Sequence, residues 1–242
     1  MRLDKLLAQM QIGTRSQVKE SIRNGSITVN GQVVTKPEYK VNESEDQICF
    51  MGRELVFQKF VYYMLHKPSG VVTATKDSHD RTVMDLMQGA AGKDLFPVGR
   101  LDKDTEGLLF ITNDGALSHR LLSPKKHVEK TYYVEYEGAL TPESIAMLEQ
   151  GVDIGDEKPT LPAKVCHVKQ LDGTYSLELS IMEGRFHQVK RMIHAIGGHV
   201  LYLKRISFGG LTLDNTLAKG AWRTLTQEEL ERLTNQKQEK GD

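Results

Sequence analysis

Two dipeptide turns constrain the fold of this chain more than any other feature of its sequence. Asn30-Gly31 separates two short apolar segments, and Asp172-Gly173 separates residues 164–171 from residues 175–181. Asn-Gly and Asp-Gly adopt the left-handed backbone of two-residue hairpin turns without strain, so each predicts a pair of antiparallel strands. A fold built only from parallel strands and crossover helices is therefore disfavoured.

The first sixty residues predict two short helices followed by the first of these hairpins. Apolar residues recur at helical spacing as far as Gly13, namely Leu3, Leu6, Leu7 and Met10. Ser16 can cap a second helix, which ends at Asn24-Gly25. Residues 1–40 carry seven Lys or Arg against three Asp or Glu, and such a local excess favours contact with phosphate. The RNA contacts expected from this helical part are Arg15, Lys19 and Arg23.

Residues 61–235 predict a second, larger domain, with residues 52–60 as the connector and 236–242 as a polar tail. Strands are expected at residues 71–75, 107–112, 132–136, 164–171 and 175–181. Helices are expected at residues 82–87, 117–122 and 185–196, and after Thr141-Pro142, where threonine caps and proline takes the first helical position. Strands and helices do not alternate one to one, which favours the α+β class with a mixed, mainly antiparallel sheet.

Charge and cysteine content narrow the class of protein. The 32 basic and 32 acidic residues cancel, which argues against general coating of nucleic acid but allows local basic patches such as residues 185–205. Cys49 and Cys166 lie far apart without neighbours at metal-ligand spacing, so we expect neither a disulfide framework nor a zinc site. No apolar segment approaches the roughly 18 residues of a membrane span. We expect a cytoplasmic monomer that binds no membrane and uses neither metal nor cofactor.

A dense polar segment, residues 99–106, lies between two apolar segments of the larger domain. Carboxylates on a loop that a sheet holds in place are both rigid and exposed, as catalytic acids need to be. The carboxylates of this segment are Asp102, Asp104 and Glu106. The spacing of the acids resembles a calcium-binding loop, but Asn113 stands where that loop needs Glu, which argues against calcium.

Residues 99–109, with the sequence GRLDKDTEGLL, resemble the central motif of pseudouridine synthases. Three further segments match that family in the same order: Lys67-Pro68-Ser69-Gly70, Lys130-Thr131-Tyr132 and residues 183–191. Over about residues 1–235 the chain is similar to the RsuA type, which modifies small-subunit ribosomal RNA. Residues 1–60 resemble the alpha-L RNA-binding module. The expected partner is therefore ribosomal RNA, within a small-subunit assembly particle.

The resemblance implies roles for particular residues. Asp102 would be the catalytic carboxylate, Tyr132 would stack on the target base, and Lys190 would pair with Asp102. Asp104, the rival carboxylate, is then expected to be a structural turn or cap residue. Arg100 would fill the gap that the extruded uridine leaves in the RNA stack. Further RNA contacts are expected on and before the helix that carries Lys190, at Arg185, His187, Gln188 and Arg191.

These residue types suit the reaction, which breaks the glycosidic bond of uridine, turns the uracil and rejoins it through carbon. The reaction needs an ionised carboxylate beside an extruded nucleotide, and a nearby ammonium keeps a partly buried Asp charged. An aromatic ring against the base contributes roughly 1–3 kcal/mol and holds the uracil while it turns. Whether Asp102 attacks the sugar, attacks the ring or removes a ribose proton stays open.

Three alternatives remain at this point. One is a pseudouridine synthase acting on large-subunit (23S) rather than 16S ribosomal RNA, because sister enzymes share this architecture. Another is a non-catalytic RNA-binding or ribosome-assembly factor, which would not need Asp102, Tyr132 and Lys190 together. The third is a methyltransferase, which the absence of a glycine-rich strand–loop–helix segment for an adenosyl cofactor disfavours.

Overall fold

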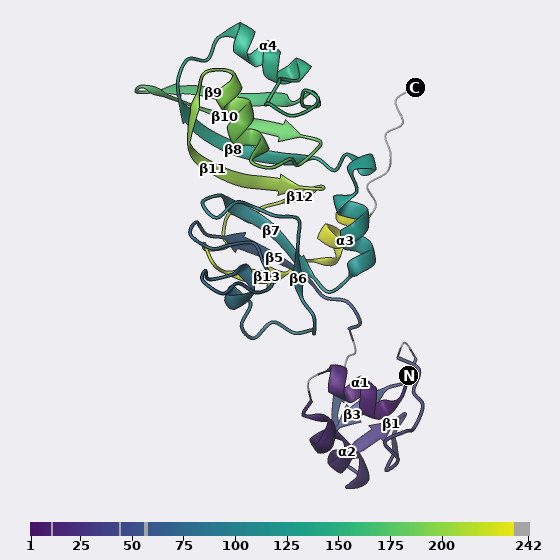
Figure 1. The fold of residues 1–242 in the computed structure, drawn as a ribbon. Helices are drawn as coiled ribbons and strands as arrows, with labels where there is room; N and C mark the ends of the chain where they lie inside the picture. The colour runs from purple at the N-terminus through teal and green to yellow at the C-terminus, as the bar shows by residue number, and fades with distance from the viewer. Residues whose placement is uncertain (11, 44, 56–57, 235–242) are drawn as a thin grey trace. The chain divides into compact units, whose positions relative to one another are not determined.

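The computed structural model describes the whole chain except residues 11, 44, 56–57 and 235–242. The chain divides into two compact units (Figure 1). One comprises Met1–Val61 with Gly89–Asp94, and the other begins at Tyr62 and contains the rest of the described chain. No helix of the described part is long and apolar enough to cross a membrane.

The N-terminal unit packs two helices against a four-stranded antiparallel sheet with the order β2-β1-β3-β4. Its elements are α1 (Leu3–Gln9), α2 (Arg15–Arg23), β1 (Ile27–Val29), β2 (Gln32–Val33), β3 (Ile48–Phe50) and β4 (Arg53–Leu55). The predicted hairpin is confirmed, with Asn30 and Gly31 both in the left-handed region between β1 and β2. Apolar residues of the helices and strands form one buried core, including Leu3, Leu6, Val18, Ile22 and Ile27.

Two local predictions for this unit were wrong. Thr14, not Ser16, caps α2, because its side chain accepts a hydrogen bond from the backbone N–H of Gln17 and the Gln17 side chain returns one to Thr14. The strand β4 also lies inside residues 52–60, which the sequence assigned to the connector. Its pairing with β3 supplies hydrogen bonds that a connector would leave to water.

The larger unit is built on a sheet with the order β13-β5-β7-β11-β8-β10-β9, extended by β6 on β7 and by β12 on β11 (Figure 1). The strands are β5 (Tyr62–Lys67), β6 (Phe96–Val98), β7 (Glu106–Thr112), β8 (Lys130–Glu137), β9 (Lys164–Leu171), β10 (Thr174–Ile181), β11 (His199–Phe208), β12 (Leu211–Thr212) and β13 (Trp222–Thr224). All of these pairings are antiparallel except that of β7 with β11. The expected mixed, mainly antiparallel sheet of an α+β fold is confirmed.

The parallel contact between β7 and β11 joins the two halves of this sheet. Gly107 of β7 lies opposite Arg205 of β11 and adopts φ +106°. A Cβ atom at Gly107 would collide with the backbone of Arg205, so only glycine permits this approach. The contact places Arg205 beside the first residues of β7, directly after the polar segment 99–106.

The helical segments of this unit are η1 (Val83–Leu86), α3 (Gly115–Leu122), η2 (Pro124–Lys126), α4 (Pro142–Gln150), α5 (Gln188–Ala195) and α6 (Gln227–Thr234). The helices pack against the strands, α3 on β6, α4 on β9 and α6 on β12. Thr141 caps α4 with Pro142 in the first turn, as predicted. The apolar side of α5, which includes Val189, Met192 and Ile193, is buried, and α5 contacts β11.

Three further predictions need correction. Residues 71–75 form no strand, because Val72 makes only an isolated bridge to Thr82 and the hydroxyl of Thr73 bonds Leu101 instead. Residues 82–87 form a short 3₁₀ turn rather than an α-helix. The helix expected at 185–196 begins only at Gln188, because His187 adopts the left-handed region with φ +48°.

Candidate active site

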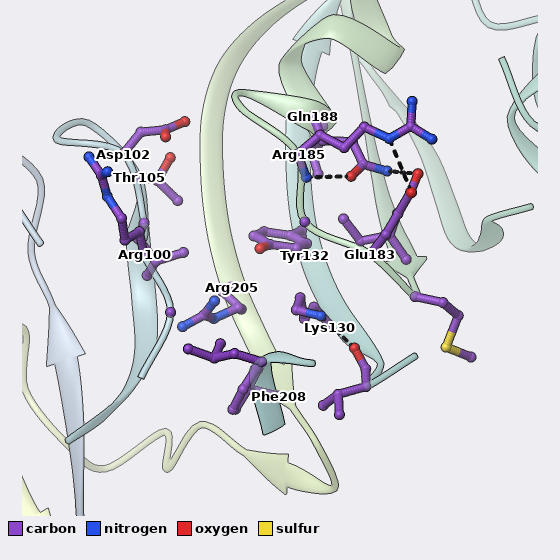
Figure 2. Close-up of a pocket in the computed structure, with 18 of the residues that line it drawn as sticks. Arg100, Asp102, Thr105, Lys130, Tyr132, Glu183, Arg185, Gln188, Arg205 and Phe208 are labelled. Carbon is purple, nitrogen blue, oxygen red and sulfur yellow. Dashed lines mark hydrogen bonds and ion pairs between the residues drawn. The ribbon is translucent and has the colours of Figure 1, made fainter. Parts of the chain in front are cut away.

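A cavity of about 320 Å³ lies in the larger unit beside β8 and β11 (Figure 2). Its walls come from the loop before β7, the strands β8 and β11, and the segment between β10 and α5. Among the predicted site residues, those that line it are Arg100, Asp102, Tyr132, Arg185, His187 and Gln188. Segments that lie far apart in the sequence therefore meet at one site, whereas Lys190 and Arg191 are not among the residues that line the cavity.

Lys67, the last residue of β5, holds the loop that carries Asp102 in place. The Lys67 side chain is fully buried, and its Nζ donates to the carbonyl oxygens of Asp102 at 2.9 Å and Thr105 at 2.8 Å. Contacts to the carbonyls of Pro68 and Lys103 are longer, at 3.1 and 3.2 Å. Burial lowers the pKa of Lys67 to about 8, although nearby acids, Asp104 foremost, oppose that shift. The loop is therefore pinned by its backbone, which leaves the carboxylate of Asp102 to face the cavity.

The carboxylate of Asp102 is about one-third exposed and lies near two basic side chains, Lys190 of α5 and His187 directly before that helix. Its Oδ2 lies 3.7 Å from the Nζ of Lys190, and its Oδ1 lies 3.6 Å from the Nε2 of His187. At these distances the contacts are electrostatic rather than hydrogen-bonded. The side chain therefore has attractive charge beside it while its oxygens remain available to a substrate.

The structure places Asp104, not Asp102, in direct contact with Lys190. Both carboxylate oxygens of Asp104 accept hydrogen bonds from Lys190 Nζ at 2.7 Å. Partial burial raises the pKa of Asp104, but the hydrogen bonds and charge of Lys190 outweigh it and leave the pKa below its usual value. Asp104 therefore positions Lys190, a role that differs from the turn or cap expected from sequence.

Tyr132 lies in β8 and forms part of the cavity wall, with only 8% of its surface exposed. The adjacent Tyr133 points to the other face of the sheet, where its hydroxyl donates to Glu135 at 2.7 Å and its ring meets Tyr202. Alternation along the strand separates the two rings in this way. Arg100 is exposed on the same loop as Asp102 (Figure 2).

Arg185 and Arg191 are engaged within the protein. Arg185 donates to the carbonyls of Lys158 at 2.6 Å and Pro159 at 2.8 Å. Arg191 donates to both carboxylate oxygens of Asp156, at 2.6 and 3.1 Å. Their contact with RNA stays a prediction. In the structure the two guanidinium groups bind the loop 154–159 to the start of α5.

Gln188 has the same internal role. It is buried, its Oε1 accepts from the backbone N–H of Arg185, and its Nε2 donates to Glu183 at 2.9 Å (Figure 2). These bonds satisfy the side-chain amide on both sides, and its RNA contact likewise stays a prediction. Together with the two arginines, Gln188 fixes the turn that presents His187 to Asp102.

Sequence reasoning missed two residues of this site. Phe186 is 76% exposed, its ring stacks on His187 with centroids 3.8 Å apart, and it lines an adjoining hollow together with Arg100 and Asp102. Arg205 lines the cavity from β11. The signals were an aromatic residue inside the already recognised motif 183–191 and a basic residue inside the apolar segment 200–208.

Two further features bear on binding. Arg15, Lys19 and Arg23 are exposed and recur every four residues, so they share one face of α2 in the N-terminal unit. Among the described residues there is no group of three or more His, Cys, Asp or Glu side chains that could hold a metal ion.

Residues 61–195 match the family described as RNA pseudouridylate synthase, and residues 1–48 match the S4 domain. The chain is 45% identical to the "Uncharacterized RNA pseudouridine synthase YtzG" of Bacillus subtilis, covering 95% of this chain and 97% of that protein. It is 40% identical to the "Ribosomal small subunit pseudouridine synthase A" of Escherichia coli, covering 95% and 98%. A crystal structure of a pseudouridylate synthase with 39% identity superposes with a TM-score of 0.66, over 96% of this chain and 99% of that one.

Proposed function

The chain belongs to the RNA pseudouridylate synthase family, and on that premise we propose that it converts one uridine of small-subunit (16S) ribosomal RNA to pseudouridine. The observation that carries the proposal is the placement of Asp102 and Tyr132 on one cavity. The nearly full-length likeness to proteins named for the small ribosomal subunit supports the choice of RNA. The substrate is the RNA within a small-subunit assembly particle, and the enzyme acts as a monomer.

In this proposal the target uridine leaves its RNA stack and enters the cavity. The cavity volume of about 320 Å³ lies at the lower end of the range for small-ligand pockets, about 300–1,000 Å³. The uracil stacks on Tyr132, and Asp102 meets the ribose and the glycosidic bond. Lys190 and His187 lie beside the carboxylate of Asp102, at 3.7 and 3.6 Å. Arg100, exposed beside the cavity, fills the gap in the RNA stack.

The reaction is an internal rearrangement. The bond between N1 of uracil and C1′ of ribose breaks, the ring turns, and a bond forms between C5 and C1′. C5 then loses its proton and N1 gains one, so no atom is added or removed overall. The residues of the cavity supply what this series of steps needs, namely a carboxylate, a stacking surface and walls that retain the free uracil.

The N-terminal unit grips the RNA in this proposal. Arg15, Lys19 and Arg23 on the exposed face of α2 contact phosphates, which orient the RNA without reading its sequence. Electrostatic contacts of this kind raise affinity for long RNA and weaken as salt is added.

Pseudouridine mapping in cells tests the proposed substrate. Ribosomal RNA from cells that lack the protein should lose one pseudouridine in the 16S molecule, and the gene for the unchanged protein should restore it. Loss of a site in 23S RNA instead would assign the enzyme to the large subunit. Unchanged maps of both RNAs would refute the proposal.

The stacking role of Tyr132 predicts unequal effects of two adjacent substitutions. Tyr132→Ala should lower kcat/KM by about 10- to 100-fold, because base–aromatic stacking contributes roughly 1–3 kcal/mol. Tyr133→Ala removes a ring on the opposite face and should change kcat/KM by less than about threefold, as for a group outside the site. Release of tritium from C5-labelled RNA measures both. Equal losses would contradict the assignment of Tyr132.

A further inference from the structure

Arg205 is a buried cation that the steps above do not use. It is 2% exposed and lines the cavity beside Tyr132, its register partner across β11 and β8. Its Nε donates to the carbonyl of Leu108 at 2.8 Å, and its guanidinium lies 5.0 Å from the ring centre of Phe208. Within the described part of the chain Arg205 has no acidic ion-pair partner, and its buried Nη2 has no hydrogen-bond acceptor.

A guanidinium in this state is costly to a protein. A buried donor without an acceptor loses its hydration and gains nothing in exchange, and the cost is greater when the group is charged. The cavity wall contains a second buried polar atom without a partner, the hydroxyl of Thr105. Two unsatisfied polar atoms on one cavity point to a polar ligand that supplies what the protein lacks.

The position of Arg205 identifies the part of the ligand that it meets. In Figure 2 Asp102 lies above Arg205, and the ring of Tyr132 lies to their right at a height between the two. A uracil that stacks on Tyr132 with its ribose toward Asp102 therefore directs its far edge toward Arg205. With N1 attached to the ribose, the atom at that far edge is the carbonyl oxygen O4.

We propose that Arg205 donates a hydrogen bond from Nη2 to the distal carbonyl oxygen of the target uracil, which makes it a specificity-determining residue of the site. This inference rests on the proposed function. Uracil presents an acceptor at this edge, whereas cytosine presents an amino group whose N–H bonds would oppose those of Arg205. The contact thus selects uridine over cytidine.

The same contact serves both orientations of the ring. Turning uracil by half a revolution about the axis through N3 and C6 exchanges N1 with C5 and O2 with O4. A carbonyl oxygen therefore faces Arg205 before the turn, as O4, and after it, as O2. When the bond between N1 and C1′ breaks, its electron pair stays on the uracil and spreads onto both oxygens, so the cation also stabilises the departing base.

A sulfur-substituted RNA tests this contact. Short RNA containing the mapped target is made with uridine or with 4-thiouridine at that position, since sulfur is a weak acceptor. Arg205→Met should lower kcat on the uridine RNA by about 100-fold or more, as does removal of one donor to a developing oxyanion. The wild type should turn over the thio RNA more slowly than the uridine RNA. Arg205→Met, which lacks the donor, should turn over the two RNAs at the same rate.

The residue next to Arg205 in β11 provides the control for this experiment. Lys204→Met changes the adjacent residue of β11, whose register partner is Tyr133 on the other face, and should behave as wild type. Two results would overturn the proposal. In one, sulfur slows Arg205→Met by the same factor as it slows the wild type; in the other, the wild type turns over 4-thiouridine as fast as uridine. If Arg205→Met fails to fold, the nucleotide preference of the conservative variant Arg205→Lys decides whether Arg205 makes the contact.

Nucleotide binding separates this inference from the proposed RNA substrate. Wild type should bind uridine 5′-monophosphate in preference to cytidine 5′-monophosphate, and Arg205→Lys should lose most of that preference. Equal binding of the two nucleotides by wild type would refute the contact with Arg205. A retained preference together with unchanged pseudouridine maps of ribosomal RNA would refute only the proposed substrate.

Discussion

Asp102→Asn should abolish release of tritium from RNA labelled at C5 of uridine, while RNA binding survives. The substitution keeps the shape of the side chain but removes the charge that the reaction needs, so we expect a loss on the order of 10⁴-fold or more, as for other essential catalytic groups. Binding should survive because the proposed RNA contacts lie elsewhere, on α2 and on Arg100. Filter binding with the same RNA measures affinity independently of turnover.

Asp104→Asn is the matched control for this experiment. Asp104 lies on the same loop, two residues away, and accepts both short hydrogen bonds from Lys190. Its loss weakens the positioning of Lys190 but leaves that ammonium free to approach Asp102. Turnover should therefore fall by about 10- to 100-fold at most, because a charged hydrogen bond contributes about 1.5–3 kcal/mol. Undiminished release by Asp102→Asn, or equal losses in both variants, would remove Asp102 from the catalytic role.

The features that sequence predicts well are those determined by neighbouring residues. Asn30-Gly31 and Asp172-Gly173 form the expected hairpins because their turn chemistry acts over a few bonds. The opposite facing of Tyr132 and Tyr133 follows from the two-residue period of a strand. The choice of Asp102 and Tyr132 as site residues came from the resemblance of their motifs to a known family.

The features that sequence misses depend on contacts between distant segments. β11 escapes prediction because its ten residues mix apolar and basic side chains, and its place in the sheet depends on the glycine at position 107. Lys190 bonds Asp104, 86 positions away, a choice between two nearby carboxylates that no local pattern specifies. Arg191 carries the charge expected of an RNA contact, yet Asp156 lies close enough to engage it.

The same reasoning applies to Lys67, whose importance depends on what the fold places around it. Lys67 follows the apolar strand β5 and is fully buried, with three N–H bonds directed at four backbone carbonyls, three of them in the loop that carries Asp102. Within the described structure, the hydrogen bonds of this ammonium link the end of β5 to that loop. The geometry of Asp102 therefore depends on a side chain that never touches the substrate.

Lys67→Met should destabilise the protein by about 3 kcal/mol or more, because each buried carbonyl left without a donor costs about 1–3 kcal/mol. Methionine has a similar volume and removes the cost of burying a charge, so the loss comes from orphaned carbonyls rather than from a cavity. These are the carbonyls of Pro68 and Thr105, since those of Asp102 and Lys103 keep the backbone N–H groups of Thr105 and Gly70. Turnover should fall with stability, since Asp102 loses its support. Urea unfolding measures the first effect, and tritium release under conditions where the variant stays folded measures the second.

Lys103→Met provides the comparison on the same loop. The Lys103 side chain is about half exposed and pairs with Asp80 at the surface, and such pairs contribute about 0–1 kcal/mol. Its replacement should therefore leave both the urea midpoint and turnover near those of the wild type. If Lys67→Met unfolds at the same urea concentration as Lys103→Met, the loop does not depend on the buried ammonium. The rigidity of Asp102 would then come from other bonds of the loop, such as those between Thr73 and Leu101 and that from the Gly70 N–H to the carbonyl of Lys103.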